Sequence, residues 1–140
     1  MLAAMLFAWA LRDTSGWTLD LPLATLLVFA LLGSTFETLF LSGLTAWLMN
    51  WTYAPRLEIL LLVALPALVL LARRTALPWK NMFSAYTLAA AGVGIFYVIS
   101  SFSYIPSRVP VFLTTIIVSG FWGMAVYFLE EMFLTKAPRA

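Results

Sequence analysis

Two apolar runs near the end of the chain, NMFSAYTLAAAGVGIFYVISSFSY at 81–104 and PVFLTTIIVSGFWGMAVYFLEEMFL at 110–134, decide the fold. Neither run carries a charged residue before Glu130, and each is more than twenty residues long. An α-helix rises about 1.5 Å per residue, so either run would cross the roughly 30 Å of a bilayer core as a helix. The sequence therefore predicts an all-α integral membrane protein.

The composition of the chain supports the same class. Of its 140 residues, 64 % are hydrophobic and 10 % are charged. A typical soluble domain has about a quarter of its residues charged. The length predicts a single transmembrane helical domain over residues 1–140. The net charge of +2 is too small to indicate a nucleic-acid partner.

The chain contains no cysteine and no histidine. The first absence excludes disulfides, thiolate metal sites and a cysteine nucleophile. The second excludes an imidazole that ligates haem iron or copper, or that acts as a general base. The sequence also has no phosphate-binding loop, nucleophile elbow or acidic metal cluster. We therefore expect a protein that is not an enzyme, with no cofactor and no metal.

The remaining sequence divides into further apolar segments. Met1 to Leu11 lacks the basic start and cleavage site of a signal peptide, so we expect a short or tilted first helix. Leu21 to Asn50 is too long for one ordinary span, and Gly33–Ser34 favours two short or tilted helices, with one long kinked helix as the alternative. Leu57 to Ala72 forms the next span, with Pro66 inside it. The total is six transmembrane helices, or five if Leu21 to Asn50 stays whole.

The basic residues predict the orientation of these helices. One side of the membrane receives Arg73, Arg74, Lys80, Lys136 and Arg139. The other side receives Arg56 and Arg108, and in the six-helix arrangement Arg12 as well. Cytoplasmic loops carry an excess of lysine and arginine. We therefore expect the Arg73–Lys80 loop and the C-terminus to lie in the cytoplasm.

Glu37 is the acidic residue that the pattern places nearest to the membrane interior. A carboxylate inside the membrane is costly, so one interpretation is a proton or cation site, or an ion pair. The other is a helix N-terminal glutamate that follows the turn Gly33–Ser34–Thr35 near the headgroups. No other ionisable residue lies in the same apolar run. We therefore favour the second interpretation and expect that Glu37 is not a transport carboxylate.

The other acidic residues of the apolar helices lie near helix ends. Glu58 follows Arg56 at a helix start, which indicates an interfacial charge pair. Glu130 and Glu131 lie in the last turns before Lys136 and predict a solvated helix end, with a partner-facing acidic pair as the alternative.

Small residues follow helical spacing in the last two helices. They are Thr115, Ser119, Gly120 and Gly123 in the last helix and Thr87, Ala90, Ala91 and Gly94 in the one before it. Such residues let helix backbones approach closely in lipid. Two interpretations stay open: the two helices pack against each other, or one set docks another membrane protein. We expect the aromatic residues of the last helix to face lipid, with pigment or a partner protein as the alternatives; they are Phe112, Phe121, Trp122 and Phe128.

Four segments carry a resemblance to a known family. They are Leu19–Asp20–Leu21–Pro22, Leu41–Ser42–Gly43–Leu44, the basic loop Arg73–Arg74–Thr75–Ala76–Leu77–Pro78–Trp79, and Arg108–Val109–Pro110–Val111–Phe112 with the following Ser119–Gly120–Phe121–Trp122. In these segments and in its helix spacing, the chain resembles the rod-shape-determining membrane protein MreD family. The resemblance implies a fold like that of vitamin-transporter substrate-binding subunits and a place in the bacterial inner membrane. It also implies a scaffold role in the cell-wall elongation machinery, with a single-span partner.

Two other functions stay open. The segment Leu129–Glu130–Glu131–Met132–Phe133 is faintly similar to the Pro-x-Glu-Glu motif and aromatics of bacterial lycopene cyclase domains, but it lacks the proline. Alternatively, the chain is an accessory subunit of a photosynthetic or respiratory membrane complex that binds lipid or pigment. For the scaffold role and for the accessory-subunit role, the expected partners are other membrane proteins and lipid.

Overall fold

The computed structural model describes residues 5–6, 20–49, 57–73, 75, 81–100, 106 and 108–136. Five helices lie in the longer described segments: α2 Asp20–Leu32, α3 Thr35–Met49, α4 Leu57–Ala72, α5 Met82–Ser100 and α6 Val109–Lys136. This part of the chain contains no strand. The all-α class is thus confirmed for the described residues. Apart from Met5 and Leu6, the expected first helix Met1 to Leu11 lies outside them.

The break between α2 and α3 is a true helix boundary. The Ser34 Oγ accepts a hydrogen bond from the Glu37 N–H at 3.2 Å, and the Glu37 carboxylate accepts one from the Ser34 N–H at 3.4 Å. This reciprocal pair is a capping box, which satisfies two backbone donors at a helix start. The expected two short helices are therefore confirmed, and the alternative of one long kinked helix is wrong.

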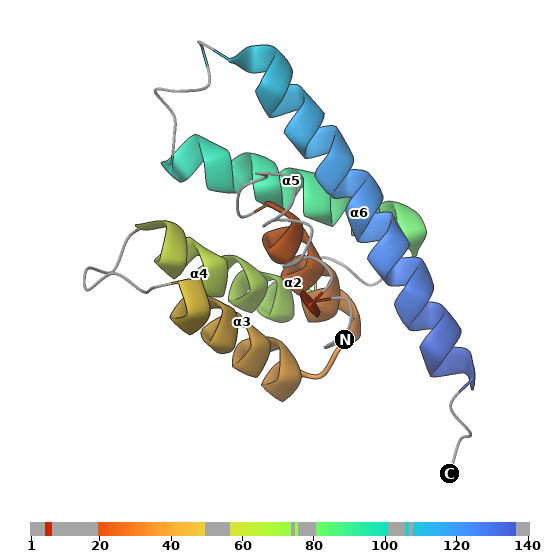
Figure 1. The fold of residues 1–140 in the computed structure, drawn as a ribbon. Helices are drawn as coiled ribbons and strands as arrows, with labels where there is room; N and C mark the ends of the chain where they lie inside the picture. The colour runs from red at the N-terminus through yellow and green to blue at the C-terminus, as the bar shows by residue number, and fades with distance from the viewer. Residues whose placement is uncertain are drawn as a thin grey trace.

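α2 is the buried centre of the bundle. Every residue from Leu21 to Leu31 is buried, and α2 packs against α3, α4, α5 and α6. A helix that is apolar on all sides is suited to such a position. Pro22 lies in the first turn, where its missing N–H interrupts no intrahelical hydrogen bond. In Figure 1, the other four helices surround α2.

The outer helices form two antiparallel pairs. α3 and α4 lie side by side and run in opposite directions, and α6 passes across α5 in the view of Figure 1. Both pairs contact α2, so α2 joins the two halves of the bundle.

Two of the described helices are long and apolar enough to cross a membrane, over Met82–Ser100 and Val109–Phe133. Only 28 % and 22 % of their most apolar windows are buried, whereas the core helix of a soluble protein is mostly buried. α2 has 13 residues and is about 20 Å long, which is shorter than a bilayer core of about 30 Å.

Candidate functional site

Glycines of α6 make close contacts with α5. A Cβ atom at Gly123 would lie 2.6 Å from the Ala89 Cβ and 3.0 Å from the Ala85 carbonyl oxygen. At Gly120 it would lie 2.6 Å from the ring of Tyr86. Such separations are below van der Waals contact, so a larger residue would push the helices apart. Gly123 therefore lies at a helix–helix contact, as the sequence predicts.

The other small residues of the expected α6 set lie on or beside the same face. Ser119 is one turn before Gly123 and is 1 % exposed, and Thr115 is half-buried. Their spacing of four residues keeps them on one side of the helix.

On α5 the buried face differs from the expected one. The buried residues are Ala85, Ala89, Gly92, Val93 and Phe96. Thr87 and Ala91 are exposed, and Ala90 and Gly94 are half-buried. Of the two interpretations, packing against α6 is therefore excluded for Thr87 and Ala91, and docking of another membrane protein stays a prediction for them. Gly94 does meet α6, since a Cβ atom there would lie 3.5 Å from the Ile116 side chain. α5 carries small residues on two faces, so their spacing alone does not indicate which face is buried.

Gly92 is a packing residue that the sequence analysis missed. A Cβ atom there would overlap the Leu27 side chain of α2. The signal was present in the sequence, because Ala85, Ala89 and Gly92 follow helical spacing as well as the expected set does.

The other small-residue face of α5 lines an open apolar groove between α5 and α6, with a volume of about 560 Å³. Its lining includes Thr87, Ala90, Ala91 and Gly94 of α5, and Phe112 and Ile116 of α6. The Thr87 hydroxyl donates to the Phe83 carbonyl at 2.9 Å. Thr87 carries the one hydroxyl of this small-residue face, and this hydroxyl already donates its hydrogen bond within α5.

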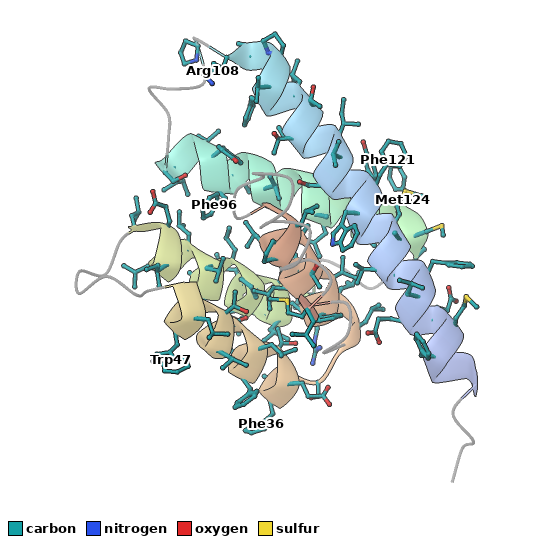
Figure 2. The ribbon with its side chains drawn as sticks, viewed as in Figure 1. Phe36, Trp47, Phe96, Arg108, Phe121 and Met124 are labelled. Atoms are coloured by element: carbon teal, nitrogen blue, oxygen red, sulfur yellow. The ribbon has the colours of Figure 1, made fainter. Side chains whose placement is uncertain are left out.

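The aromatic residues of α6 do not share one environment. Phe121 projects outward from α6 in Figure 2 and is 60 % exposed, and Phe128 is exposed too. Phe112 is half-buried and meets the Tyr97 ring edge to face at 6.1 Å. Trp122 donates from Nε1 to the buried Thr25 Oγ1 at 2.8 Å. The prediction that Trp122 faces lipid is therefore wrong for its indole N–H, which is directed at α2.

Arg73 closes the end of the bundle at which α2 stops. Its Nη1 donates to the Gly33 carbonyl at 2.7 Å and to the Ala30 carbonyl at 3.3 Å, and its Nη2 donates to the Thr35 Oγ1 at 3.2 Å. The last carbonyls of a helix have no intrahelical donor, and a cation there interacts favourably with the helix dipole. Arg73 is thus a structural cap as well as a residue of the basic loop.

The two candidate acidic sites have different environments. Glu37 lies in the first turn of α3, where it is exposed and forms the capping box with Ser34. Glu130 is 7 % exposed on the inward side of α6, whereas its neighbour Glu131 is exposed. The predicted solvated helix end is therefore wrong for Glu130, because the inward face of α6 extends beyond Val126 and Tyr127 to this position.

After its first residue, Thr35, α3 places its hydroxyls inward and its aromatic rings outward. Thr38, Ser42 and Thr45 are at most 2 % exposed. Phe36 and Trp47 are 78 % and 71 % exposed, and both project away from the bundle in Figure 2. A helix at a water-facing surface has the opposite arrangement. The polarity of α3 therefore suits an apolar surrounding.

The described polar side chains mainly serve helix structure. Among residues 5–6, 20–49, 57–73, 75, 81–100, 106 and 108–136, no group of three or more histidine, cysteine, aspartate or glutamate residues could hold a metal ion. The features that remain as a candidate site are the groove between α5 and α6 and the outward apolar faces beside it. Neither a protein-family model, nor a curated protein, nor a solved structure matches this chain.

Proposed function

We propose that the chain is a non-catalytic integral membrane protein that acts as a scaffold or assembly subunit and docks other membrane proteins. The observation that carries this proposal is the polarity of the outer helices. Large apolar side chains are exposed on all of them, including Phe36, Leu71, Phe83 and Phe133 at 72–78 %. Soluble monomers rarely expose contiguous apolar patches of this kind. Lipid and apolar partner helices would cover these side chains and keep them out of contact with water.

The arrangement of the helices supports a multi-pass topology. The Arg73–Thr35 hydrogen bond ties the α2–α3 turn to the end of α4. Helices α2 to α6 then cross in alternating directions, with Met1 to Leu11 as a further short helix in the six-helix arrangement. We place the Arg73 end and the C-terminus of α6 on the cytoplasmic side of a bacterial inner membrane, following the excess of basic residues there.

The groove between α5 and α6 is the proposed docking surface. Ala90, Ala91 and Gly94 lack bulky side chains, so a partner helix can approach the α5 backbone closely. Ala91 is exposed, which leaves this face available. Within this class we propose a scaffold of the cell-wall elongation machinery, the role implied by the resemblance to the MreD family.

A second candidate function is an accessory subunit of a photosynthetic or respiratory complex that binds lipid or pigment. The observation in its favour is the exposed ring pair on α3. Phe36 and Phe40 stack with their centroids 6.3 Å apart, and both are exposed. Flat apolar ligands stack on such surfaces.

Site-specific photo-crosslinking in native membranes tests the proposed docking surface. A benzoylphenylalanine replaces Ala91 in the groove or, as the matched control, Leu71 on the exposed side of α4. We expect position 91 to form an adduct with a membrane protein of the elongation machinery, and position 71 to form lipid adducts only. Lipid adducts alone at both positions would contradict the docking function. Adducts with subunits of a coloured complex would support the second candidate instead.

A further inference from the structure

Ser42 is an exception among the hydroxyls of the described helices. The usual arrangement is a hydrogen bond to the carbonyl four residues earlier, made by Thr25, Thr38, Thr45, Thr87, Ser100 and Thr114. The Ser42 Oγ is fully buried and has no hydrogen-bond partner, and the same holds for the Ser119 Oγ. Burial of an unpaired hydroxyl is costly, so each of these two atoms calls for a physical explanation.

The register of α3 and α4 places Ser42 level with Pro66. The two helices run antiparallel, as Figure 1 shows, and the hydrogen bond between Arg73 and Thr35 aligns their ends. Both helices rise about 1.5 Å per residue. Ser42 lies about two turns into α3 from Thr35, and Pro66 lies about two turns back along α4 from Arg73. Both residues are buried, which places them on inward faces.

Pro66 leaves an acceptor unused at this level. Proline has no N–H, so the Leu62 carbonyl lacks the donor that a helix normally supplies. The proline ring also pushes that carbonyl away from its ideal position and opens the helix locally. Leu62 is 1 % exposed, so bulk solvent does not reach this side of α4. An unpaired donor on α3 thus lies level with an unpaired acceptor on α4.

We infer that one water molecule is bound between the Ser42 hydroxyl and the Leu62 carbonyl, in the contact between α3 and α4. The water accepts from the Ser42 O–H and donates to the Leu62 oxygen. Thr45 lies on the same inward face one turn further, and its hydroxyl donates to the Leu41 carbonyl at 2.7 Å. The Thr45 hydroxyl oxygen still has a free lone pair, which accepts a hydrogen bond from the second O–H of the water. Three such bonds are typical of a buried water. This site is independent of the proposed docking function.

Ser119 provides the matched control. It is buried and unpaired like Ser42. Of the two helices on which α6 packs, α2 has its one proline, Pro22, in the first turn, where it frees no carbonyl, and α5 contains no proline. Every residue of α5 therefore keeps its N–H, and no carbonyl is freed in the same way. A water is therefore expected at Ser42 and none at Ser119.

Water-edited solid-state NMR of the full chain in lipid bilayers tests this site. Labelling leucine carbonyls with ¹³C and valine nitrogens with ¹⁵N gives signals from the Leu-Val pairs alone, which are Leu27–Val28, Leu62–Val63 and Leu68–Val69. Val63→Ala identifies the Leu62 signal by its loss. We expect magnetisation from water to reach the Leu62 carbonyl several-fold faster than those of Leu27, which is buried in α2, and Leu68, on the exposed side of α4.

Three substitutions then assign the water to Ser42. Ser42→Ala should reduce the transfer at Leu62 to the level of Leu27, whereas Ser42→Thr and the control Ser119→Ala should preserve it. Transfer at Leu62 as slow as at Leu27 in the unsubstituted chain overturns the inference, whether or not the variants fold. Fast transfer that survives Ser42→Ala also overturns it. So does a shift of the Leu62 carbonyl in Ser42→Ala without any transfer from water, because that result indicates a direct hydrogen bond.

Discussion

The indole N–H of Trp122 donates to the hydroxyl of Thr25 at 2.8 Å, and this hydroxyl donates in turn to the Leu21 carbonyl at 2.8 Å. The pair joins α6 to the fully buried α2. The Thr25 hydroxyl thus both accepts and donates a hydrogen bond at a site with no exposed area. In a low-dielectric interior such a paired hydroxyl is stabilising, and an unpaired partner is costly.

Thr25→Val should therefore destabilise the bundle. Valine keeps the shape of threonine but removes the acceptor of the Trp122 N–H, and loss of one partner of a buried hydrogen bond costs about 1–3 kcal/mol. The measurement is thermal unfolding in mild detergent. Thr114→Val is the control, because Thr114 is exposed and its hydroxyl bonds its own helix. Equal effects of the two substitutions would show that the Trp122 bond does not support the fold.

Gly123→Leu should lower the thermal stability in the same assay. Its side chain would have to enter a space already filled by Ala89, Ala85 and Val28, and overpacking of this kind costs about 1–3 kcal/mol or more. Gly43→Ala is the matched control. No atom lies within 4 Å of a Cβ built there, and replacing glycine inside a helix by alanine gains about 0.5–1 kcal/mol. If both variants are equally stable, close packing at Gly123 does not hold α6 in place.

Arg73→Gln should destabilise the end of the bundle formed by α2, α3 and α4. The substitution removes the donor that joins the Gly33 and Ala30 carbonyls, at an expected cost of about 1–3 kcal/mol. Arg73→Lys keeps the charge but not the planar fork, so it should recover only part of the loss. Hydrogen exchange at the C-terminal turn of α2 provides the measurement. Full recovery by lysine would mean that charge alone matters at this position.

Glu37→Gln should leave folding and assembly nearly intact. Glutamine also forms a capping box with Ser34, and the charge at a helix N-terminus contributes only about 0.3–1 kcal/mol. Glu37→Leu removes the side-chain acceptor and should cost more. Unfolding of the two variants is compared in the same detergent. A proton-coupled transport activity in liposomes that disappears with Glu37→Gln would refute both this expectation and the scaffold function.

Features that depend on neighbouring residues in the chain could be predicted from the sequence. The α2–α3 break follows from Gly33–Ser34 and Glu37, because a capping box is formed within one turn of helix. The contact at Gly123 follows from small-residue spacing within one helix.

Features that depend on which face of a helix meets another helix could not be predicted. α5 has two small-residue faces, and only its packing on α2, where Gly92 meets Leu27, shows which one is buried. In the sequence, Arg73 resembles an ordinary basic residue of a loop. Its hydrogen bond to the Gly33 carbonyl could not be predicted, because it joins segments far apart in the chain. Glu130 is buried by the same kind of long-range packing.

In the proposed membrane arrangement, the outward faces of α5 and α6 lie in lipid. The chain has no native cysteine, so single cysteines report directly on their surroundings. Thr75→Cys provides the water-accessible reference, since Thr75 is exposed beside the end of α4. It should react with an impermeant maleimide in inverted vesicles and not in intact cells. Reaction in intact cells would reverse the proposed orientation.

Phe121→Cys is the most direct test, because Phe121 is 60 % exposed and projects from the middle of α6. A thiol in the hydrocarbon core stays protonated and does not react with maleimide, since the thiolate is the nucleophile. We predict that Phe121→Cys is unreactive in intact cells and in inverted vesicles, and becomes reactive once the membrane is dissolved in denaturing detergent. Reaction of Phe121→Cys as fast as that of Thr75→Cys in inverted vesicles would contradict the membrane-embedded account.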